Sequence, residues 1–455
     1  MATTRIIVPT GHLGTTPFEP ESFRRGCAEN PDYIVADSGS ADIGPHPLGS
    51  GRPSSDPEWQ YRDLEEMVLR ARELDVPMIV GSAADTGSNT GVDSYLEMLV
   101  RIAKEHNLPQ FRVAGLYSEL PVSTAINMFD EGVAFSGLNG RPDANRPMIE
   151  RSDHIVAVMG ARPILSALQE GADVIVTGRA SDPSIFAAPL IHKGHELADA
   201  YLAGKALECA SFCAEPFMGK ETILGEVSRG RVDLTAMHPE QRCTPLSVAG
   251  HTMYERVTPY EELVPGGRLD LSECTYEQLD AKTTRVTGQT FEVNETYAIK
   301  IEGSGKVAER RITIAGVRDP HTIEHIDQAI ELARGKLESR FGPVGDTYDI
   351  YFHLYGKNAV MGSRDTAAPR IPHELGIVVD VSAEDPTLAE RVCQIAAKAL
   401  FYARLPNVKG TAGTSAIYTD QILVANAVYQ WTLNHTVVLD DPDTLFHTEV
   451  RTVGV

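Results

Sequence analysis

The sequence predicts an α/β protein with a mostly parallel, doubly wound sheet, a β-rich segment and a C-terminal ferredoxin-like α+β domain. In the first half, short apolar runs alternate with helical periods, and the runs are apolar enough for burial on both faces of a parallel sheet. In the last third, the order strand–helix–strand–strand–helix indicates a split βαβ domain. At roughly 100–200 residues per domain, the 455 residues suffice for two or three domains.

The elements of the first half follow from these runs in chain order. We expect strands at residues 5–9, 33–37, 77–82, 111–117, 154–160 and 173–178. Between them we expect helices at residues 23–30, 59–74, 94–106, 124–131 and 161–170. A distorted barrel is the alternative fold, but it would need two more such units.

Three domains are predicted. Residues 1–220 form the parallel domain with the site loops, and a helical region at 184–215 completes it. Residues 221–305, rich in Thr, Val, Glu and Gly, form a β-rich linking segment. Residues 306–455 form the ferredoxin-like domain. Its expected elements are strands at 310–317, 348–356, 374–382 and 436–440, and helices at 320–341 and 386–404.

Composition narrows the class of partner. The chain has 41 Lys+Arg against 63 Asp+Glu, a formal net charge of -22, so neither nucleic acid nor an anionic membrane surface is expected to bind. No run approaches the roughly 20 apolar residues of a membrane span, and the N-terminus lacks the pattern of a signal peptide. Six cysteines spread over a long chain indicate reduced thiols and a cytoplasmic protein. A small anionic substrate remains compatible, because one local arginine can dominate a pocket.

Polar residues follow the predicted strands of the first domain. In open α/β sheets, ligands bind at the carboxyl ends of the strands, so we expect these loops to share one cleft. Neighbouring carboxylates push their pKa values apart, which supplies an acid and a base at neutral pH. The expected catalytic residues are Asp37, Asp85 and Asp182, with His12 as the alternative proton carrier. For each aspartate, a helix cap or a turn is an equally good explanation.

Arg179 is expected to bind the anionic end of a substrate, because a guanidinium can donate two hydrogen bonds to a carboxylate or phosphate. The other residues that we expect to contact the substrate are Ser38, Asp42, Ser82, Thr86, Glu119, Asn139, Arg141, Asp143 and Ser181. Two polar loops, 137–147 and 409–415, are candidate lids, with an ordinary surface connection as the alternative for both.

Cofactor motifs give little support for a bound group. The chain has no complete dinucleotide fingerprint, no phosphate-binding G-x-x-x-x-G-K-[ST] loop and no G-x-S-x-G elbow. No cofactor is expected, although the cleft carboxylates could hold a divalent metal with waters. His321 and His325 have a spacing that can chelate, but their place in a first helical turn beside Glu324 favours a surface face. Cys209 and Cys213 are four residues apart in a helical stretch, and we interpret them as buried thiols.

Several segments resemble the acyclic terpene utilisation family: FSGLNGRPDA (135–144), GADVIVTGRASDPSIFAAPL (171–190) and ALEC (206–209). The stretch from HELGIVVDV to KGTAGTS is similar to the C-terminal part of that family. The resemblance covers most of the chain, and 177–183 is its most specific part. The first loop departs from the family in having less Gly and Ala, so His12 indicates a different substrate. The resemblance implies an intracellular enzyme of small-molecule catabolism and supplies no mechanism.

The expected function is an enzyme that acts on a small carboxylate or acyl substrate, CoA thioesters included, by acid/base chemistry. A lyase/hydratase or isomerase needs an acid, a base and a group that binds the anion, and all three residue types are present. One alternative is a metal-assisted hydrolase. Another is a non-catalytic subunit of a catabolic complex. A homo-oligomer is expected on general grounds.

Overall fold

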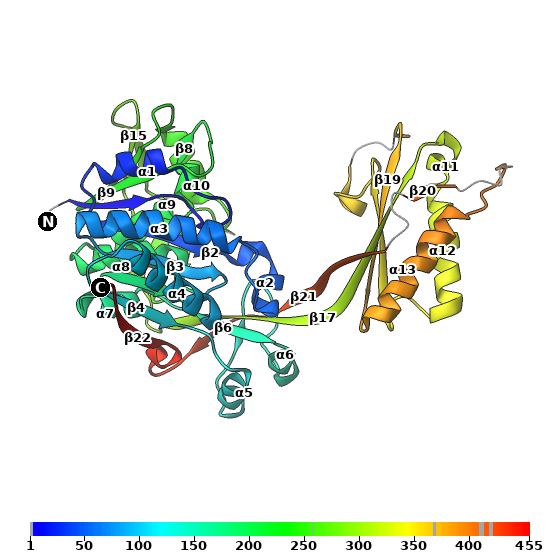
Figure 1. The fold of residues 1–455 in the computed structure, drawn as a ribbon, viewed down its shortest axis with the longest axis horizontal. Helices are drawn as coiled ribbons and strands as arrows, with labels where there is room; N and C mark the ends of the chain where they lie inside the picture. The colour runs from blue at the N-terminus through cyan, green and yellow to red at the C-terminus, as the bar shows by residue number, and fades with distance from the viewer. Residues whose placement is uncertain (1–2, 257, 367–369, 409–413, 418–421) are drawn as a thin grey trace. The chain divides into compact units, whose positions relative to one another are not determined.

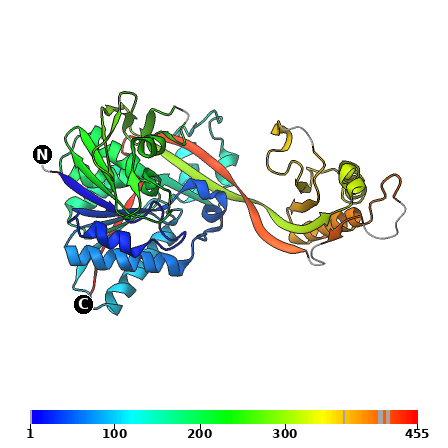
Figure 2. The ribbon, with the colours of Figure 1, turned by 90° about the horizontal axis from the view of Figure 1, so that it is seen from above.

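The computed structural model describes residues 3–256, 258–366, 370–408, 414–417 and 422–455 (Figure 1). The chain divides into two compact units. The larger unit comprises Met1–Gly305 and Trp431–Val455, and the smaller unit comprises Lys306–Gln430. The long strands β17 (Ala298–Val317) and β21 (Leu423–Val438) are neighbours in one sheet and contribute residues to both units (Figure 2).

Parallel strands form the centre of a ten-stranded sheet in the larger unit. They lie in the order β1-β2-β3-β7-β4. Their bounds are Thr4–Val8, Tyr33–Gly39, Met78–Asp85, Val174–Thr177 and Phe111–Tyr117. Nearly all of their residues are buried, because helices cover both faces, and the strands predicted here are confirmed.

Two separate apolar clusters lie on the two faces of these strands. One face packs against α1, α3 and α4, with bounds Pro20–Cys27, Pro57–Leu74 and Asn89–Glu105 (Figure 1). The other face packs against α7, α8 and α9, with bounds Ala161–Gln169, Asp182–His192 and Leu197–Leu207. The prediction of a mixed α/β fold is therefore confirmed.

Antiparallel strands extend the sheet at both ends. Beyond β1 lie β9, β10, β15 and β14, with bounds Ile223–Ser228, Arg231–Ala236, Thr283–Thr287 and Thr275–Gln278. Beyond β4 lies β22 (His447–Val453). The segment predicted to be β-rich also holds α10 (Pro245–Met253). Its remaining strands are β11, β12, β13 and β16, with bounds Arg242–Cys243, Glu261–Val264, Gly267–Asp270 and Thr290–Val293.

The strand predicted at 154–160 is present, but its expected place in the parallel sheet is wrong. β6 (His154–Val158) instead pairs antiparallel with β17, with Val158 opposite Lys300. A short apolar run has the same pattern in either sheet, so periodicity alone could not separate the two. Near it lie β5 (Ser136–Gly137), α5 and α6; the two helices span Val122–Asp130 and Arg146–Glu150.

The smaller unit is an α+β unit with strand order β18-β19-β17-β21, in which β19 is antiparallel to both neighbours. β18 is Tyr348–Tyr355 and β19 is Leu375–Ala383. Its helices are α11 (Pro320–Glu324), α12 (Ile326–Phe341) and α13 (Pro386–Phe401). One helix was expected over 320–341; His325, at φ -105° and ψ 18°, separates the two that form. Among the described residues, no helix combines the length and the apolar character needed to cross a bilayer.

Candidate active site

Arg179 lies in a buried polar cluster just after β7. It is 7% exposed. Its Nε donates to Glu302 Oε2 at 3.0 Å, and its Nη1 donates to Asp182 Oδ1 at 3.0 Å and to Ser82 Oγ at 3.2 Å. Burial works against the guanidinium charge, but the two carboxylates outweigh it and raise the pKa of Arg179. Groups of the protein itself therefore hold this arginine.

Glu302 comes from β17 and completes the cluster. Lys300 Nζ lies 2.6 Å from its Oε1, so each carboxylate oxygen faces a cation. Burial alone would raise the pKa of Glu302, but Arg179 and Lys300 lower it to about 2. Glu302 is thus a carboxylate at neutral pH, and its charge faces Arg179 and Lys300. The sequence did not predict it, because it stands inside a strand and far along the chain from the loops that follow the parallel strands.

Asp37 and Asp182 are neighbouring carboxyl groups in different surroundings. Asp37 is 3% exposed, and its Oδ1 accepts from the backbone N–H of Ser38 at 2.8 Å and of Gly39 at 3.2 Å. Burial, followed by the charge of Asp182, raises the pKa of Asp37 well above its usual range, although Arg179 and the two N–H groups oppose this. The side chain of Asp182 is 29% exposed and ion-paired to Arg179. A buried carboxyl that favours its proton therefore lies near a partly exposed carboxyl paired with an arginine.

Asp85 is bound by the loop that follows α2 (Pro45–Ser50). Its Oδ2 accepts from the backbone N–H of Ser54 at 2.5 Å and of Ser55 at 2.7 Å, and His12 Nε2 lies 3.4 Å from its Oδ1. Burial raises the pKa of Asp85, but the hydrogen bonds from His12 and Ser55 outweigh it and lower the pKa. Asp85 therefore stays ionised, holds the loop and orients His12.

The backbone at the end of β3 is strained. Ser82, Ala84 and Asp85 all have positive φ, of 47°, 51° and 74°. Residues with a Cβ seldom adopt this region, and such outliers cluster at functional sites. Gly39 lies against this turn, where a Cβ would stand 2.3 Å from the Asp85 carbonyl oxygen. The close approach requires glycine at this position.

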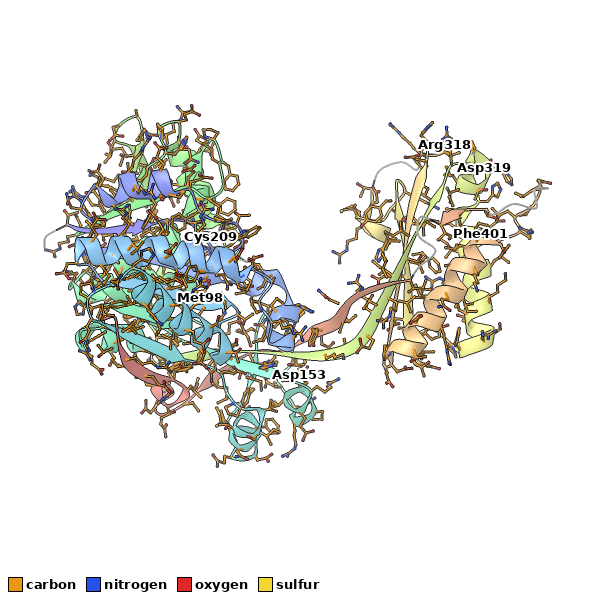
Figure 3. The ribbon with its side chains drawn as sticks, in the orientation of Figure 1. Met98, Asp153, Cys209, Arg318, Asp319 and Phe401 are labelled. Carbon is orange, nitrogen blue, oxygen red and sulfur yellow. The ribbon has the colours of Figure 1, made fainter. Side chains whose placement is uncertain are left out.

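Cys209 lies beside the aspartates, although the sequence predicted only a buried thiol there. It follows α9 in a left-handed conformation with φ 46° (Figure 3). A Cβ at Gly11 would stand 2.3 Å from its Cα, so the first loop packs directly on it. Burial, followed by the charge of Asp37, raises the pKa of the thiol. Its presence in the segment ALEC was the signal that could have identified it.

Lys220 joins the first loop to the same region. Its Nζ donates to the carbonyl of His12 and to Thr15 Oγ1. Burial lowers the pKa of Lys220, although Asp63 and Cys209 oppose this.

A second buried ionic cluster lies at the end of α9. Its side chains are Lys205, Glu208, Arg256 and Glu262, which are 4%, 10%, 9% and 19% exposed. Lys205 is ion-paired to Glu208, and Arg256 Nε lies 3.5 Å from Glu262 Oε2. Burial, opposed by Lys205 and helped by Asp182, raises the pKa of Glu208 to about 8. Asp182 also raises the pKa of Glu262, so the two clusters are electrostatically linked.

Arg256 differs from Arg179 in its surroundings. Its Nε, Nη1 and Nη2 are all buried, and none has a hydrogen-bond partner among the described residues. The guanidinium of Arg256 therefore has Glu262 as an ion-pair partner at 3.5 Å but makes no hydrogen bond within the described part of the chain. The sequence offered no signal for Arg256, which follows a helix in the segment expected to link two domains.

The other predicted positions fall in several places. Ser38 Oγ lies 2.5 Å from Tyr95 OH within the core. Asp42 and Arg141 line a hollow of about 210 Å³ together with Glu302. Thr86 lines a cavity of about 10 Å³ beside Arg179, and Ser181 is the N-cap residue of α8. The Asp143 carboxylate accepts a hydrogen bond from the backbone N–H of Gly137 at 3.1 Å, and Asn139 is exposed. Of the candidate lids, 137–147 brings Arg141 to this hollow, and residues 409–413 lie outside the described residues.

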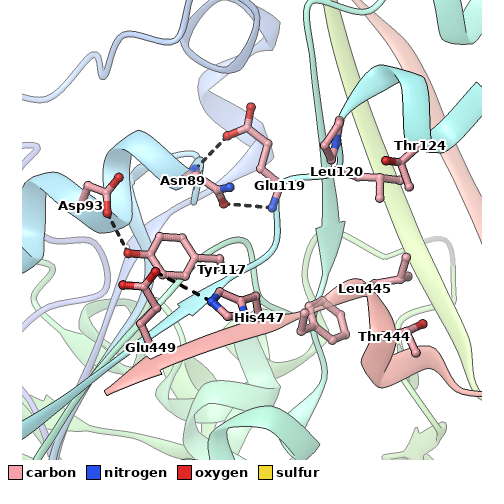
Figure 4. A pocket seen from close by; sticks show the side chains of 12 residues that line it. Asn89, Asp93, Tyr117, Glu119, Leu120, Thr124, Thr444, Leu445, His447 and Glu449 are labelled. Carbon is pink, nitrogen blue, oxygen red and sulfur yellow. Dashed lines mark hydrogen bonds and ion pairs between the residues drawn. The ribbon is translucent and has the colours of Figure 1, made fainter. Parts of the chain in front are cut away.

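Glu119 lies in a separate pocket of about 430 Å³ at the end of β4 (Figure 4). Its Oε2 accepts from the backbone N–H of Asn89 at 2.8 Å, and His154 Nδ1 lies 2.6 Å from its Oε1. Burial raises the pKa of Glu119, but His154 outweighs it and lowers the pKa. Asp93 and His447 line the same pocket from α4 and β22. The structure therefore places Glu119 apart from Asp37 and Asp182.

Comparison with known proteins supports the resemblance seen in the sequence. The family model for the acyclic terpene utilisation family protein AtuA matches residues 4–438. Searches of the curated proteins and of the solved structures found no match. The matched range includes every residue of the Arg179 and Arg256 clusters. Because this range is nearly the whole chain, the protein belongs to the acyclic terpene utilisation family, AtuA.

Proposed function

We propose that the protein is an enzyme that acts on a small carboxylate or acyl substrate by proton transfer, as a lyase/hydratase or an isomerase. The arrangement of Asp37, Asp182 and Arg179 carries the proposal. Asp182 is partly exposed and paired with Arg179, which suits a base that removes a proton from the substrate. Asp37 is buried close by and favours its protonated form, which suits an acid.

Arg256 is the residue that we propose binds the anionic end of the substrate. The Nε and Nη1 groups of Arg179 already donate within the protein, whereas the three nitrogens of Arg256 are buried and have no hydrogen-bond partner among the described residues, with Glu262 as an ion-pair partner at 3.5 Å. A buried polar group left unpaired costs about 1–3 kcal/mol, and more when it is charged. A substrate carboxylate would remove this cost through two parallel hydrogen bonds, and Lys205 adds a second positive charge nearby.

The two groups are close enough to serve one small substrate. Asp182 raises the pKa of Glu208 and of Glu262, and Glu262 lies 3.5 Å from Arg256. A substrate carboxylate on Arg256 would therefore present its carbon chain toward Asp182. Cys209 lies near this space and would help to shape it, since Asp182 and Tyr254 both affect the pKa of its thiol.

Deuterium exchange tests this function on a panel of candidate substrates. Small carboxylates and acyl thioesters are incubated with the protein in D₂O, and loss of the C–H signal is followed by NMR. Loss of an acid/base group lowers such rates by about 10²–10⁴-fold, so D182N should lose exchange by that amount. The matched control is D93N, in the pocket of Figure 4. If D182N exchanges at the native rate, or if only D93N loses exchange, the proposed site is wrong.

Arg256 has its own test with the same substrates. R256M should raise the substrate concentration needed for half-maximal exchange by about tenfold or more, because a charge-assisted bidentate contact is lost. The control is R242M, which removes an exposed arginine paired with Glu215. An unchanged concentration dependence in R256M would mean that the anion binds elsewhere.

Two features of the smaller unit and of the assembly remain proposals. We propose that the smaller unit is ferredoxin-like, since β19 lies between β17 and β18 in the manner of a split βαβ motif. Three further expectations also stay predictions: a homo-oligomeric assembly, a small anionic substrate as the ligand, and a cytoplasmic location.

A further inference from the structure

Three metal-ligating side chains lie together in the smaller unit. His321, Glu324 and His325 each offer one ligand atom, and these atoms all lie within 4.8 Å of one another. His321 and His325 are four residues apart across α11, so their rings stand on one side of the turn, with centroids 4.2 Å apart. None of these residues belongs to the proposed active site.

Backbone carbonyls determine which ring nitrogens carry protons. His321 Nε2 lies 2.7 Å from the carbonyl oxygen of Pro406, and His325 Nδ1 lies 2.9 Å from the carbonyl oxygen of His321. A carbonyl can only accept, so each of these nitrogens is the donor. In each neutral ring the lone pair is then on the other nitrogen, Nδ1 of His321 and Nε2 of His325. Metal-binding histidines have this arrangement, in which the second nitrogen donates to a carbonyl or carboxylate.

The turn that carries the cluster is anchored from its other side. Asp319, labelled in Figure 3, is the N-cap residue of α11, and its Oδ2 accepts from the backbone N–H of Thr322 at 2.7 Å. Thr322 and Ile323 are buried, whereas Glu324 is exposed. The ligand side chains therefore stand on a backbone that is already ordered, and the exposed carboxylate leaves the cluster open to an ion from solvent.

We propose that His321, Glu324 and His325 bind a divalent transition-metal ion. Two imidazoles and one carboxylate form a ligand set that Zn²⁺ accepts, and Co²⁺ and Ni²⁺ use the same donors. Three protein ligands leave a coordination position for water. Under this proposal His321 and His325, expected to form a plain surface face, would form a metal site apart from the residues of the proposed active site.

The test is a titration of the whole, tag-free protein with Co²⁺ and Zn²⁺. Co²⁺ is followed by its visible absorption, and Zn²⁺ by competition with a coloured chelator. We expect one ion per chain at this site. H325A and E324Q should each weaken binding by about tenfold or more, whereas H447A, which removes an exposed histidine of the larger unit, should bind as the native protein does.

Two variants are used because H325A also removes the donor to the His321 carbonyl. E324Q keeps the shape of an exposed side chain and leaves the turn intact. The proposal is overturned if the native protein binds no ion, or if E324Q and H325A bind with native affinity. Since none of these residues is in the acid/base cleft, the outcome is independent of the exchange assay.

Discussion

Removal of the Glu302 charge should destabilise the larger unit by several kcal/mol. The pKa of this carboxyl falls from its usual 4.5 to about 2, because Arg179 and Lys300 outweigh the effect of burial. The difference is about 2.5, and at about 1.36 kcal/mol per pKa unit it corresponds to ~3 kcal/mol of stability. E302Q keeps the shape of the side chain but removes the carboxylate that pairs with Lys300 and Arg179, of which Arg179 keeps Asp182; breaking a buried pair typically costs about 3–5 kcal/mol. We therefore expect E302Q to lose ~3 kcal/mol at pH 7.

Urea unfolding followed by tryptophan fluorescence measures the loss of stability in the larger unit, which contains Glu302. The protein has two tryptophans, and both Trp59 and Trp431 belong to the larger unit. The matched control is E226Q, which removes a carboxylate that also pairs with an arginine but is 28% exposed. Exposed pairs contribute about 0–1 kcal/mol, so E226Q should change little.

The pH dependence gives a second check on the same reasoning. A carboxyl with a lowered pKa stabilises the folded state above its unfolded value of 4.5, and that stability is lost as pH falls toward 2. The difference between native protein and E302Q should therefore be constant from pH 7 to about 5 and should narrow below pH 4.5. If E302Q costs no more than E226Q at pH 7, the buried ion pairs do not contribute as argued.

Two further predictions concern the first loop and Asp37. D37N should be more stable than the native protein at pH 8, and this gain should shrink as the pH falls. The reason is that the pKa of Asp37 is raised in the folded state, so the native protein loses stability as the pH rises toward that folded pKa. An equal gain at pH 5 and pH 8 in urea unfolding would contradict this. G11A should lower the thermal midpoint, since a Cβ would stand 2.3 Å from Cys209 Cα and overpacking typically costs about 1–3 kcal/mol. Its control is G250A in α10, where a Cβ meets nothing within 4 Å and removal of a helical glycine should be neutral or stabilising; equal midpoints for the two variants would refute the close contact.

The parallel strands and their loops could be predicted because burial on both faces leaves a readable apolar run. The ends of such strands meet at one edge of the sheet, so Asp37 and Asp182 were expected together, and the charge of Asp182 does raise the pKa of Asp37. Ser38 shows the limit of this logic, since successive residues at a strand end point to opposite faces and its hydroxyl meets Tyr95 in the core.

The partners of these loops could not be predicted from local pattern. Glu302, Arg256 and Cys209 come from a strand, a connection and a helix end in different parts of the chain. Nothing in the residues next to Glu302 and Arg256 marks a site, because each joins its cluster only through tertiary packing, and for Cys209 the one signal was the segment ALEC. β6 was assigned to the wrong sheet for the same reason: its partner β17 lies far along the chain.

The division of the larger unit into two chain segments has a consequence for its folding during synthesis. β22 pairs with β4 along its full length, from His447 opposite Tyr117 to Val453 opposite Phe111. The ribosome therefore delivers the last strand of the main sheet only after the whole of Lys306–Gln430 has been made. That smaller unit is continuous in sequence and can fold while β4 still has an open edge. The large sheet cannot be completed until β22 has been made, and until then the unpaired edge of β4 is the surface of the nascent chain most exposed to unwanted strand pairing.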